Sequence, residues 1–369
     1  MTWNHPRGLD SVTGSNALLK QEMDVEVDWD ARSLLAFGDQ PVAEFYQGYD
    51  LMVIDHPHVP DAVHSGTVIS FDELISATDL ETLKRTSVGE SHLSYQYQGL
   101  QWALAVDTAA QVSAFRADKA DRAPIFWSEV IELAKTGTLL WPHKPVDAFS
   151  TFATLMAQNG APIASPNSFI DKKVAEEVLT LMIEISGLTP DFCLNSNPID
   201  IAEALSGGDR FTYGICMYGY SNYSRLGFRG KILTYDDLPS LDGRASGSQL
   251  GGAGIAVSSA SRDPVLAARV ALKLSSPDIQ STSYAQAGGQ PANLAAWKSA
   301  HLNTLTNNFY SNTLRSLERA WVRPRIYGWP EVQYAASQII HAILSSKKII
   351  STDLDAIEDT YAQYIKETR

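Results

Sequence analysis

The chain has 369 residues, of which 44% are apolar and 19% are charged, and it carries a formal net charge of -13 with an isoelectric point near 5.0. This length exceeds the size at which one hydrophobic core stops growing, so we expect two domains. The acidic balance, without a block of Lys or Arg, argues against a surface for nucleic acid or anionic membrane. No run of about 18 apolar residues predicts a membrane span.

The chain opens with a short apolar stretch. Met1, Thr2 and Trp3 precede the polar sequence "NHPRG", which predicts a brief first strand followed by a loop. Because strands usually have about five or six residues, we expect further residues upstream. Residues 23–29, "MDVEVDW", alternate apolar and acidic side chains, and this period of two predicts a strand near a sheet edge with one solvated face.

Later segments alternate between strand and helix patterns. "YDLMVI" (49–54) and "GGAGIAVS" (251–258) are short apolar runs bounded by turn formers, as is typical of strands covered on both faces. Helical spacing appears in "APIFWSEVIELAKTG", "DKKVAEEVLTLMIEIS", "DPVLAARVALKLSS" and "PEVQYAASQIIHAILSS". This alternation predicts doubly wound α/β sheets.

Polar side chains follow two of the predicted strands. In open α/β sheets ligands bind beyond the carboxyl ends of strands, so side chains at those ends share one crevice if the strands are neighbours. The residues concerned are Trp3, Asn4, His5, Arg7, Asp55 and His56. Together they offer a stacking ring, a carboxylate, amide and imidazole groups, and one permanent cation.

The cluster Asp55-His56-Pro57-His58 has three interpretations. Zinc would suit its ligand types, but no third or fourth ligand stands at a recognisable spacing, and we expect His58 to face solvent. Asp55 and His56 could instead be the acid and base of a hydrolase or lyase, although no nucleophile elbow, metalloprotease motif or phosphate-binding loop accompanies them. The third interpretation is one wall of a binding pocket.

Aromatic residues gather in two further segments. "CMYGYSNYSR" contains Tyr218, Tyr220 and Tyr223, and "RPRIYGWPE" contains Tyr327 and Trp329 beside Arg323 and Arg325. Such rings either pack in a core or form the rim of a pocket for a small polar ligand. Cys193 and Cys216 have neither zinc-site nor redox-motif spacing, and whether they form a disulfide stays open.

Taken in order, the segments carry a resemblance over essentially the whole chain. They are "TWNHPRG", "YDLMVIDHPH", "LQWALAVDTAAQVSAFRAD", "FWSEVIELAK", "GGAGIAVSSASRDPVLAARVALKLSSPDIQ" and "GGQPANLAAW". This succession resembles the family 1 extracellular solute-binding proteins of ABC importers, the carbohydrate-type relatives of maltose-binding and glycerol-3-phosphate-binding proteins.

The resemblance implies a periplasmic-binding-protein-like fold of two doubly wound α/β lobes with a ligand cleft. The lobes would be joined by hinge crossings near residues 105–110, 255–262 and 308–322. Residues 1–106 and 262–308 would form the N-terminal lobe, and 107–261 and 309–369 the C-terminal lobe. The ligand-binding residues that it implies are Trp3, Asn4, His5, Arg7, Asp55, His56, Asp107, Tyr218, Tyr220, Gly252, Gly254, Tyr327 and Trp329.

The resemblance also implies a function. The chain would be a non-enzymatic, monomeric substrate-binding protein, without metal, cofactor or nucleic acid, that delivers a small polar solute to ABC permease subunits by hinge closure. The histidines and Arg7 favour a sugar acid or a related anion over a neutral sugar. The family is periplasmic or extracellular, but the first residues show no signal peptide, so a cytoplasmic ligand sensor on the same scaffold is an alternative.

Overall fold

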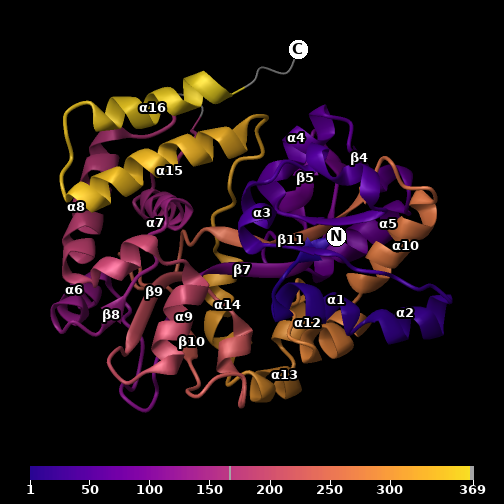
Figure 1. The fold of residues 1–369 in the computed structure, drawn as a ribbon, viewed down its shortest axis with the longest axis horizontal. Coiled ribbons are helices and arrows are strands. Elements are labelled where there is room, and N and C mark those ends of the chain that lie inside the picture. Colours follow the sequence, from indigo (N-terminus) through magenta and orange to yellow (C-terminus); the bar gives the residue numbers. More distant parts are fainter. Residues whose placement is uncertain (166–167, 366–369) are drawn as a thin grey trace. The chain divides into compact units, whose positions relative to one another are not determined.

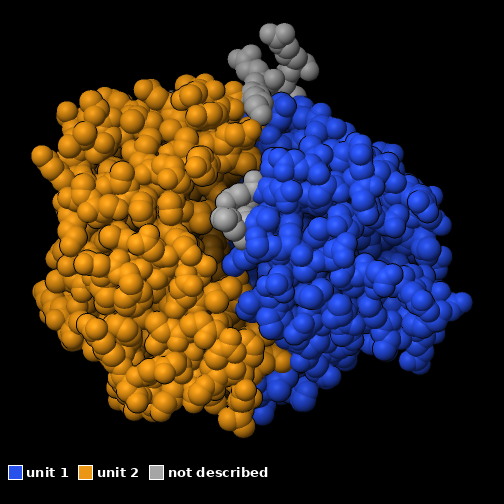
Figure 2. Space-filling model, viewed as in Figure 1, with its two compact units in different colours: residues 1–109, 251–305, 325–327 blue, residues 110–250, 306–324, 328–369 orange. Residues whose placement is uncertain are grey.

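The computed structural model describes residues 1–165 and 168–365, which form two compact units (Figures 1 and 2). Unit 1 comprises residues 1–109, 251–305 and 325–327, and unit 2 comprises residues 110–250, 306–324 and 328–369. The chain therefore passes repeatedly from one unit to the other, as expected of lobes joined by crossings.

Two long strands contain the first two crossings. Strand β7 (Leu104–Phe115) crosses after residue 109, and β11 (Leu250–Ser258) crosses back after residue 250. The second crossing lies earlier than the expected 255–262. The reason is that residues 254–257 pair antiparallel with β3 (Leu51–Ile54), which fixes nearly all of β11 in unit 1.

Unit 1 is built on short strands around β3. Strand β1 (Thr2–Trp3) pairs in parallel with β2 (Ala31–Arg32), and β4 (Val68–Ile69) pairs with β11. On its other side β1 continues beside β3, because the Val53 N–H donates to the Met1 carbonyl at 3.0 Å. The predicted first strand and the strand at 51–54 are therefore neighbours, and the polar segments that follow them start at the same edge.

The helices of unit 1 cover this sheet (Figure 1). They are α1 (Ser11–Thr13), α2 (Asn16–Met23), α3 (Leu34–Asp39), α4 (Val59–His64), α5 (Ala77–Thr86), α10 (Pro264–Leu274), α11 (Pro277–Ile279), α12 (Leu294–Trp297) and α13 (Ala300–Leu305). A hairpin of β5 (Gln96–Tyr97) and β6 (Leu100–Gln101) completes the unit. Helix α10 starts where predicted, because Asp263 accepts a hydrogen bond from the Leu266 N–H and Pro264 occupies the first turn.

The strand predicted at residues 23–29 is wrong. Helix α2 ends at Met23, and residues 24–30 belong to no described strand. Val25, Val27 and Trp29 nevertheless pack against the core of unit 1, and the Asn16 side chain donates to the Val27 carbonyl at 2.9 Å. The alternating pattern thus reflects one-sided burial, which does not require a pairing strand.

The strands of unit 2 are arranged around β7. The later residues of β7 pair antiparallel with β9 (Tyr213–Tyr218) and with β10 (Thr234–Asp236), and β9 pairs in parallel with β8 (Leu139–Leu140). The helices are α6 (Trp127–Lys135), α7 (Pro145–Gln158), α8 (Lys172–Leu188), α9 (Pro198–Gly207), α14 (Phe309–Glu318), α15 (Trp329–Ser346) and α16 (Asp353–Tyr364). Each of the four segments with helical spacing overlaps an observed helix over most of its length, α6, α8, α10 or α15, which confirms those predictions.

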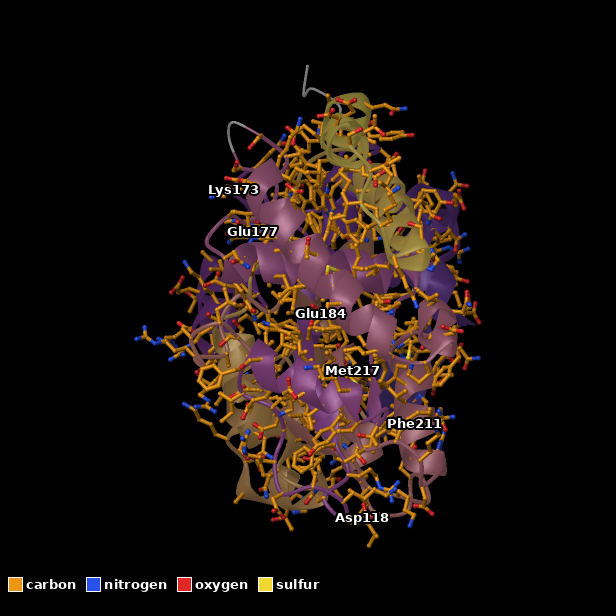
Figure 3. The ribbon with its side chains drawn as sticks, turned by 90° about the vertical axis from the view of Figure 1, so that its left-hand side faces the viewer. Asp118, Lys173, Glu177, Glu184, Phe211 and Met217 are labelled. Carbon is orange, nitrogen blue, oxygen red and sulfur yellow. The ribbon has the colours of Figure 1, made fainter. Side chains whose placement is uncertain are left out.

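Helix α7 is the centre of this unit, since every residue from Asp147 to Met156 is buried. Helix α8 is amphipathic: Ala175, Val178 and Met182 face the core, whereas Lys173, Glu177 and Glu184 lie on its exposed side (Figure 3). Cys193 and Cys216 are buried free thiols, so the open question of a disulfide is answered in favour of separate cysteines. Burial raises the pKa of Cys193 to about 11.

Candidate functional site

An ion pair joins Arg7, in the polar segment after β1, to Asp107 in the first half of β7. Arg7 Nε donates to Asp107 Oδ2 at 2.7 Å, and Arg7 Nη2 donates to the other carboxylate oxygen. The side chains of Arg7 and Asp107 are only 5% and 1% exposed. This contact joins residues 100 positions apart.

Local structure holds this pair in place. Arg7 lies in the short helical segment Pro6–Asp10, which begins where His5 Nδ1 accepts the Arg7 backbone N–H at 3.0 Å. Burial raises the pKa of Asp107, and the Arg7 guanidinium opposes that rise. The backbone of Gln290 also hydrogen-bonds the Asp107 carboxylate. The charge of Arg7 is therefore balanced inside unit 1.

The segment after β3 forms a packed turn. Asp55 Oδ1 accepts the His56 backbone N–H at 2.8 Å and lies 3.2 Å from His56 Nδ1. The His56 ring is 1% exposed and meets the Tyr95 ring edge-on, with 6.0 Å between centroids. His58 is also buried, with Nε2 2.8 Å from the Gly38 carbonyl, so the expectation that it faces solvent is wrong. Among the described residues, no group of three or more His, Cys, Asp or Glu could hold a metal.

Two glycines of β11 allow the backbone to pass close to these groups. Gly252 has φ +136°, and a Cβ built on it would lie 2.4 Å from the Asp107 carbonyl oxygen. A Cβ on Gly254 would lie 2.7 Å from the Tyr95 ring. Both positions therefore require glycine for close packing.

The remaining predicted residues of unit 1 differ in exposure. Trp3 is buried in the core, and its ring centroid lies 5.0 Å from that of Phe37, which corrects the stacking role expected of it. Asn4 is exposed, and its backbone N–H donates to the Arg32 carbonyl. Tyr327 also belongs to unit 1, where it stacks on His64 with 4.1 Å between ring centroids.

Unit 2 contains the other predicted aromatic residues. Trp329 starts α15 and is fully buried against Phe149 and Phe169, so it belongs to the core of this unit. Tyr220 is also buried, whereas Tyr218, the last residue of β9, is partly exposed. The sequence thus identified ring-rich segments correctly, but it could not separate core rings from those at a surface.

Sequence reasoning missed Gln249, the residue before β11. Its Nε2 donates to Tyr218 Oη at 2.6 Å and to Ser150 Oγ at 3.0 Å, and its backbone N–H donates to Thr154 Oγ1. Its Oε1 is buried and, among the described residues, has no hydrogen-bond partner. A buried acceptor left in this state can accept a hydrogen bond from a ligand hydroxyl. The one signal in the sequence that could have pointed to Gln249 is its position among several glycines.

A second polar network holds the elements that carry Tyr218 and Gln249. Gln111 of β7 donates to Thr151 Oγ1 at 3.2 Å and to the Cys216 carbonyl at 3.0 Å, and it accepts from Thr154 Oγ1 at 2.6 Å. These bonds tie β7, α7 and β9 together. The Tyr218–Gln249 pair is therefore held on a rigid base, as a specific binding surface requires.

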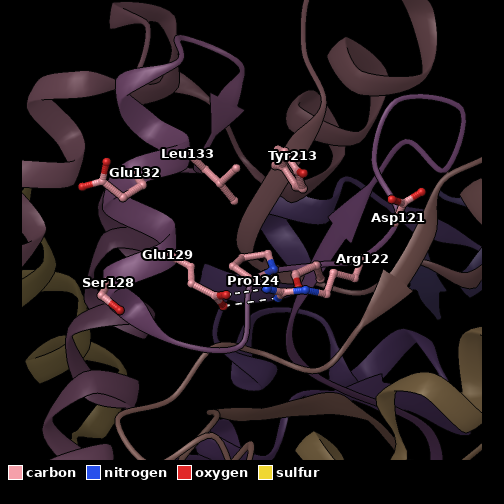
Figure 4. Close-up of a pocket in the computed structure, with 9 residues that line it drawn as sticks. Asp121, Arg122, Pro124, Ser128, Glu129, Glu132, Leu133 and Tyr213 are labelled. Atoms are coloured by element: carbon pink, nitrogen blue, oxygen red, sulfur yellow. Dashed lines mark hydrogen bonds and ion pairs between the residues drawn. The ribbon is translucent and has the colours of Figure 1, made fainter.

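An open pocket of about 550 Å³ lies elsewhere in unit 2 (Figure 4). Its main polar groups are engaged with each other: the Glu129 carboxylate accepts from Arg122 and from the backbone N–H of Ile125 at 2.6 Å. These bonds, led by the one from Arg122, lower the pKa of Glu129 to about 2. The arrangement caps the start of α6, and the pocket is lined by none of the predicted ligand-binding residues.

No protein-family model matches the sequence, and no curated protein matches it. Solved structures match over nearly the whole chain. The maltose-bound MalE3 of T. maritima has a TM-score of 0.78 at 17% identity, covering 96% of this chain and 95% of that one. A solute-binding protein from Agrobacterium radiobacter K84 in complex with ribitol has a TM-score of 0.76 at 17% identity, covering 98% and 96%.

The chain has the fold of the ABC solute-binding proteins. A further member of this group, from Thermotoga lettingae TMO and bound with alpha-D-tagatose, matches with a TM-score of 0.77 at 15% identity, over 96% of this chain and 95% of that one. The predicted periplasmic-binding-protein-like fold is thereby confirmed. At these identities the likeness concerns the fold, and the neighbours are binding proteins rather than enzymes.

Proposed function

We propose that this protein is the substrate-binding component of an ABC importer and that it captures a small, neutral, polyhydroxylated solute. The observation that carries the proposal is the match of 96–98% of the chain to solute-binding proteins solved with maltose, ribitol or alpha-D-tagatose. These ligands are neutral, and hydroxyl groups are the polar groups that they offer to a protein.

The Arg7–Asp107 pair favours a neutral solute over the sugar acid or related anion expected from the sequence. Both donors on one edge of the guanidinium already bind the carboxylate, so a solute anion would have to displace a buried internal partner. Tyr218 and Gln249 in unit 2 add a hydroxyl and a spare carbonyl acceptor, without added charge. Neutral hydroxyls match these groups best.

The contacts of Asp55 and His56 support capture without turnover. A hydrolase or lyase would need them as acid and base toward a substrate or a water molecule. In the structure, Asp55 Oδ1 instead caps the turn that contains His56. Hinge closure, the mechanism proposed for capture, needs only that the solute bind the closed state more tightly than the open one.

The proposed partners are the permease subunits of an ABC transporter, and the proposed location is outside the cytoplasmic membrane. One neighbour with a TM-score of 0.73, from Listeria monocytogenes, is described as a maltose-binding periplasmic protein. Within residues 1–165 and 168–365, no helix has the length and apolar character needed to cross a bilayer.

A thermal-unfolding screen tests the function. Sugars, polyols, sugar acids and phosphates would each be added to the wild-type protein, and a neutral sugar or polyol should raise the melting temperature. A ligand that binds only the native state stabilises it by about 2.7 kcal/mol at a hundredfold excess over Kd. The solute should be recovered unchanged by chromatography, and small-angle scattering should show a smaller radius of gyration. Formation of a new product would favour the hydrolase.

A further inference from the structure

Arg32 is a buried cation, and most of the N–H donors of its guanidinium have no hydrogen-bond partner among the described residues. It ends β2, next to the core of unit 1, and is 9% exposed. The one hydrogen bond of its side chain among the described residues is donated by Nη2 to the Val53 carbonyl at 3.4 Å, which is long for such a bond. Nε and Nη1 are buried and have no hydrogen-bond partner among the described residues.

The surroundings of Arg32 supply aromatic faces but no carboxylate in direct contact with it. Its guanidinium carbon lies 4.2 Å from the centroid of the Phe45 ring and 5.6 Å from that of Phe37. Within the described chain, no Asp or Glu lies within ion-pair distance of it. Burial lowers the pKa of Arg32 to about 10, so the group stays charged at neutral pH.

Arg116, another buried arginine, differs from Arg32 in the partners of its guanidinium group. Arg116 is fully buried in unit 2, where it binds the carboxylates of Asp118 and Asp209 and the carbonyl of Leu205. Removing a guanidinium from water is costly unless charge and hydrogen bonds compensate it. Cation–π contact with Phe45 compensates the face of the Arg32 group but leaves its N–H edges unpaired.

We propose that Arg32 binds a small monovalent anion, either a halide such as chloride or a compact carboxylate such as formate, at the unpaired N–H edge of its guanidinium. One negative charge would neutralise the guanidinium and accept from the Nε or Nη1 donors. The burial of Arg32 restricts the occupant to a small ion. This site is independent of the proposed solute, because its donors belong to β2 and none of the predicted ligand-binding residues contributes a side chain.

Diffraction with bromide tests the proposal on the unaltered protein. Crystals grown in sodium bromide should show an anomalous peak within hydrogen-bonding distance of Arg32 Nε or Nη1. A water molecule in that position, or no density, in crystals with bromide bound elsewhere would overturn the proposal. Replacing bromide by formate separates the two sources: trigonal density beside the guanidinium identifies a carboxylate, while a site occupied only in bromide identifies a halide.

Thermal unfolding tests the same site in solution. Adding sodium chloride or formate should raise the melting temperature of the wild-type protein by more than a general salt effect does, and this difference is read against Arg32→Met in the same salts. At ten times Kd the folded-to-unfolded ratio should increase about elevenfold. Arg32→Met keeps an apolar stem between the rings and should abolish the difference. Arg85→Met, an exposed position of the same unit, should retain it. An equal response in Arg32→Met and wild type would refute the anion site. If Arg32→Met does not fold, the diffraction experiment on the wild type is the deciding test.

Discussion

Replacement of Asp107 by Leu should strongly destabilise the protein. Arg7 and Asp107 are 5% and 1% exposed, so solvent screens their interaction little. The substitution leaves the Arg7 guanidinium buried without its counter-charge, and breaking a buried pair in this way costs about 3–5 kcal/mol. Arg7→Met should cost a similar amount, because it leaves the Asp107 carboxylate buried. The double variant Arg7→Met/Asp107→Leu removes both charges and should be much closer to the wild type.

Urea unfolding monitored by circular dichroism measures the four proteins of this cycle. Each single loss should exceed the loss of the double variant, so the coupling free energy, which is the sum of the single losses minus the double loss, should be at least about 3 kcal/mol. As a control, Lys20→Met breaks the exposed pair with Asp24 and should change the midpoint little. Single losses that are small and strictly additive would refute the buried pair and would restore Arg7 as a candidate for binding an anionic solute.

Three further predictions concern single positions. Gly252→Ala should cost about 1–3 kcal/mol in urea unfolding, because its Cβ would clash with the Asp107 carbonyl, whereas Gly48→Ala, with open space around the Cβ, should not. Burial raises the pKa of Asp147 to about 8, so the folded state retains this proton above the usual pKa and stability is lost as pH rises through 8. Asp147→Asn should remove that loss, worth several kcal/mol, when melting temperatures at pH 6 and 8.5 are compared. Gln249→Leu should weaken solute binding in calorimetry by about 0.5–1.5 kcal/mol, and an unchanged affinity would exclude its Oε1 as an acceptor.

Local patterns in the sequence predicted the elements well. The strand at 51–54 and helix α10 follow from continuous apolar runs, helical spacing and capping residues, all of which act over a few positions. The segment 23–29 shows the limit of this reasoning, because one-sided burial gives the same alternation whether or not a neighbouring strand pairs with it. Pairing depends on residues far away in the sequence.

The candidate site was harder to predict for the same reason. Whether Arg7 binds an acid within unit 1 or an external anion depends on Asp107, which the fold brings to it from 100 residues away. His58 looks exposed in a polar cluster, yet the Gly38 carbonyl provides a buried partner for it. Gln249 carries no motif at all, and only the contacts with Ser150 and Tyr218 show that one of its polar atoms remains available.

Calorimetric titration with a matched pair of ligands tests the central claim most directly. The neutral sugar or polyol that most raises the melting temperature would be compared with its carboxylate derivative, each at pH 6 and pH 8. We predict saturating heats for about one neutral solute per chain, nearly equal affinity at both pH values, weaker binding of the acid, and recovery of the solute unchanged. Tighter binding of the acid, or heat that continues after saturation while a product accumulates, would contradict capture of a neutral solute.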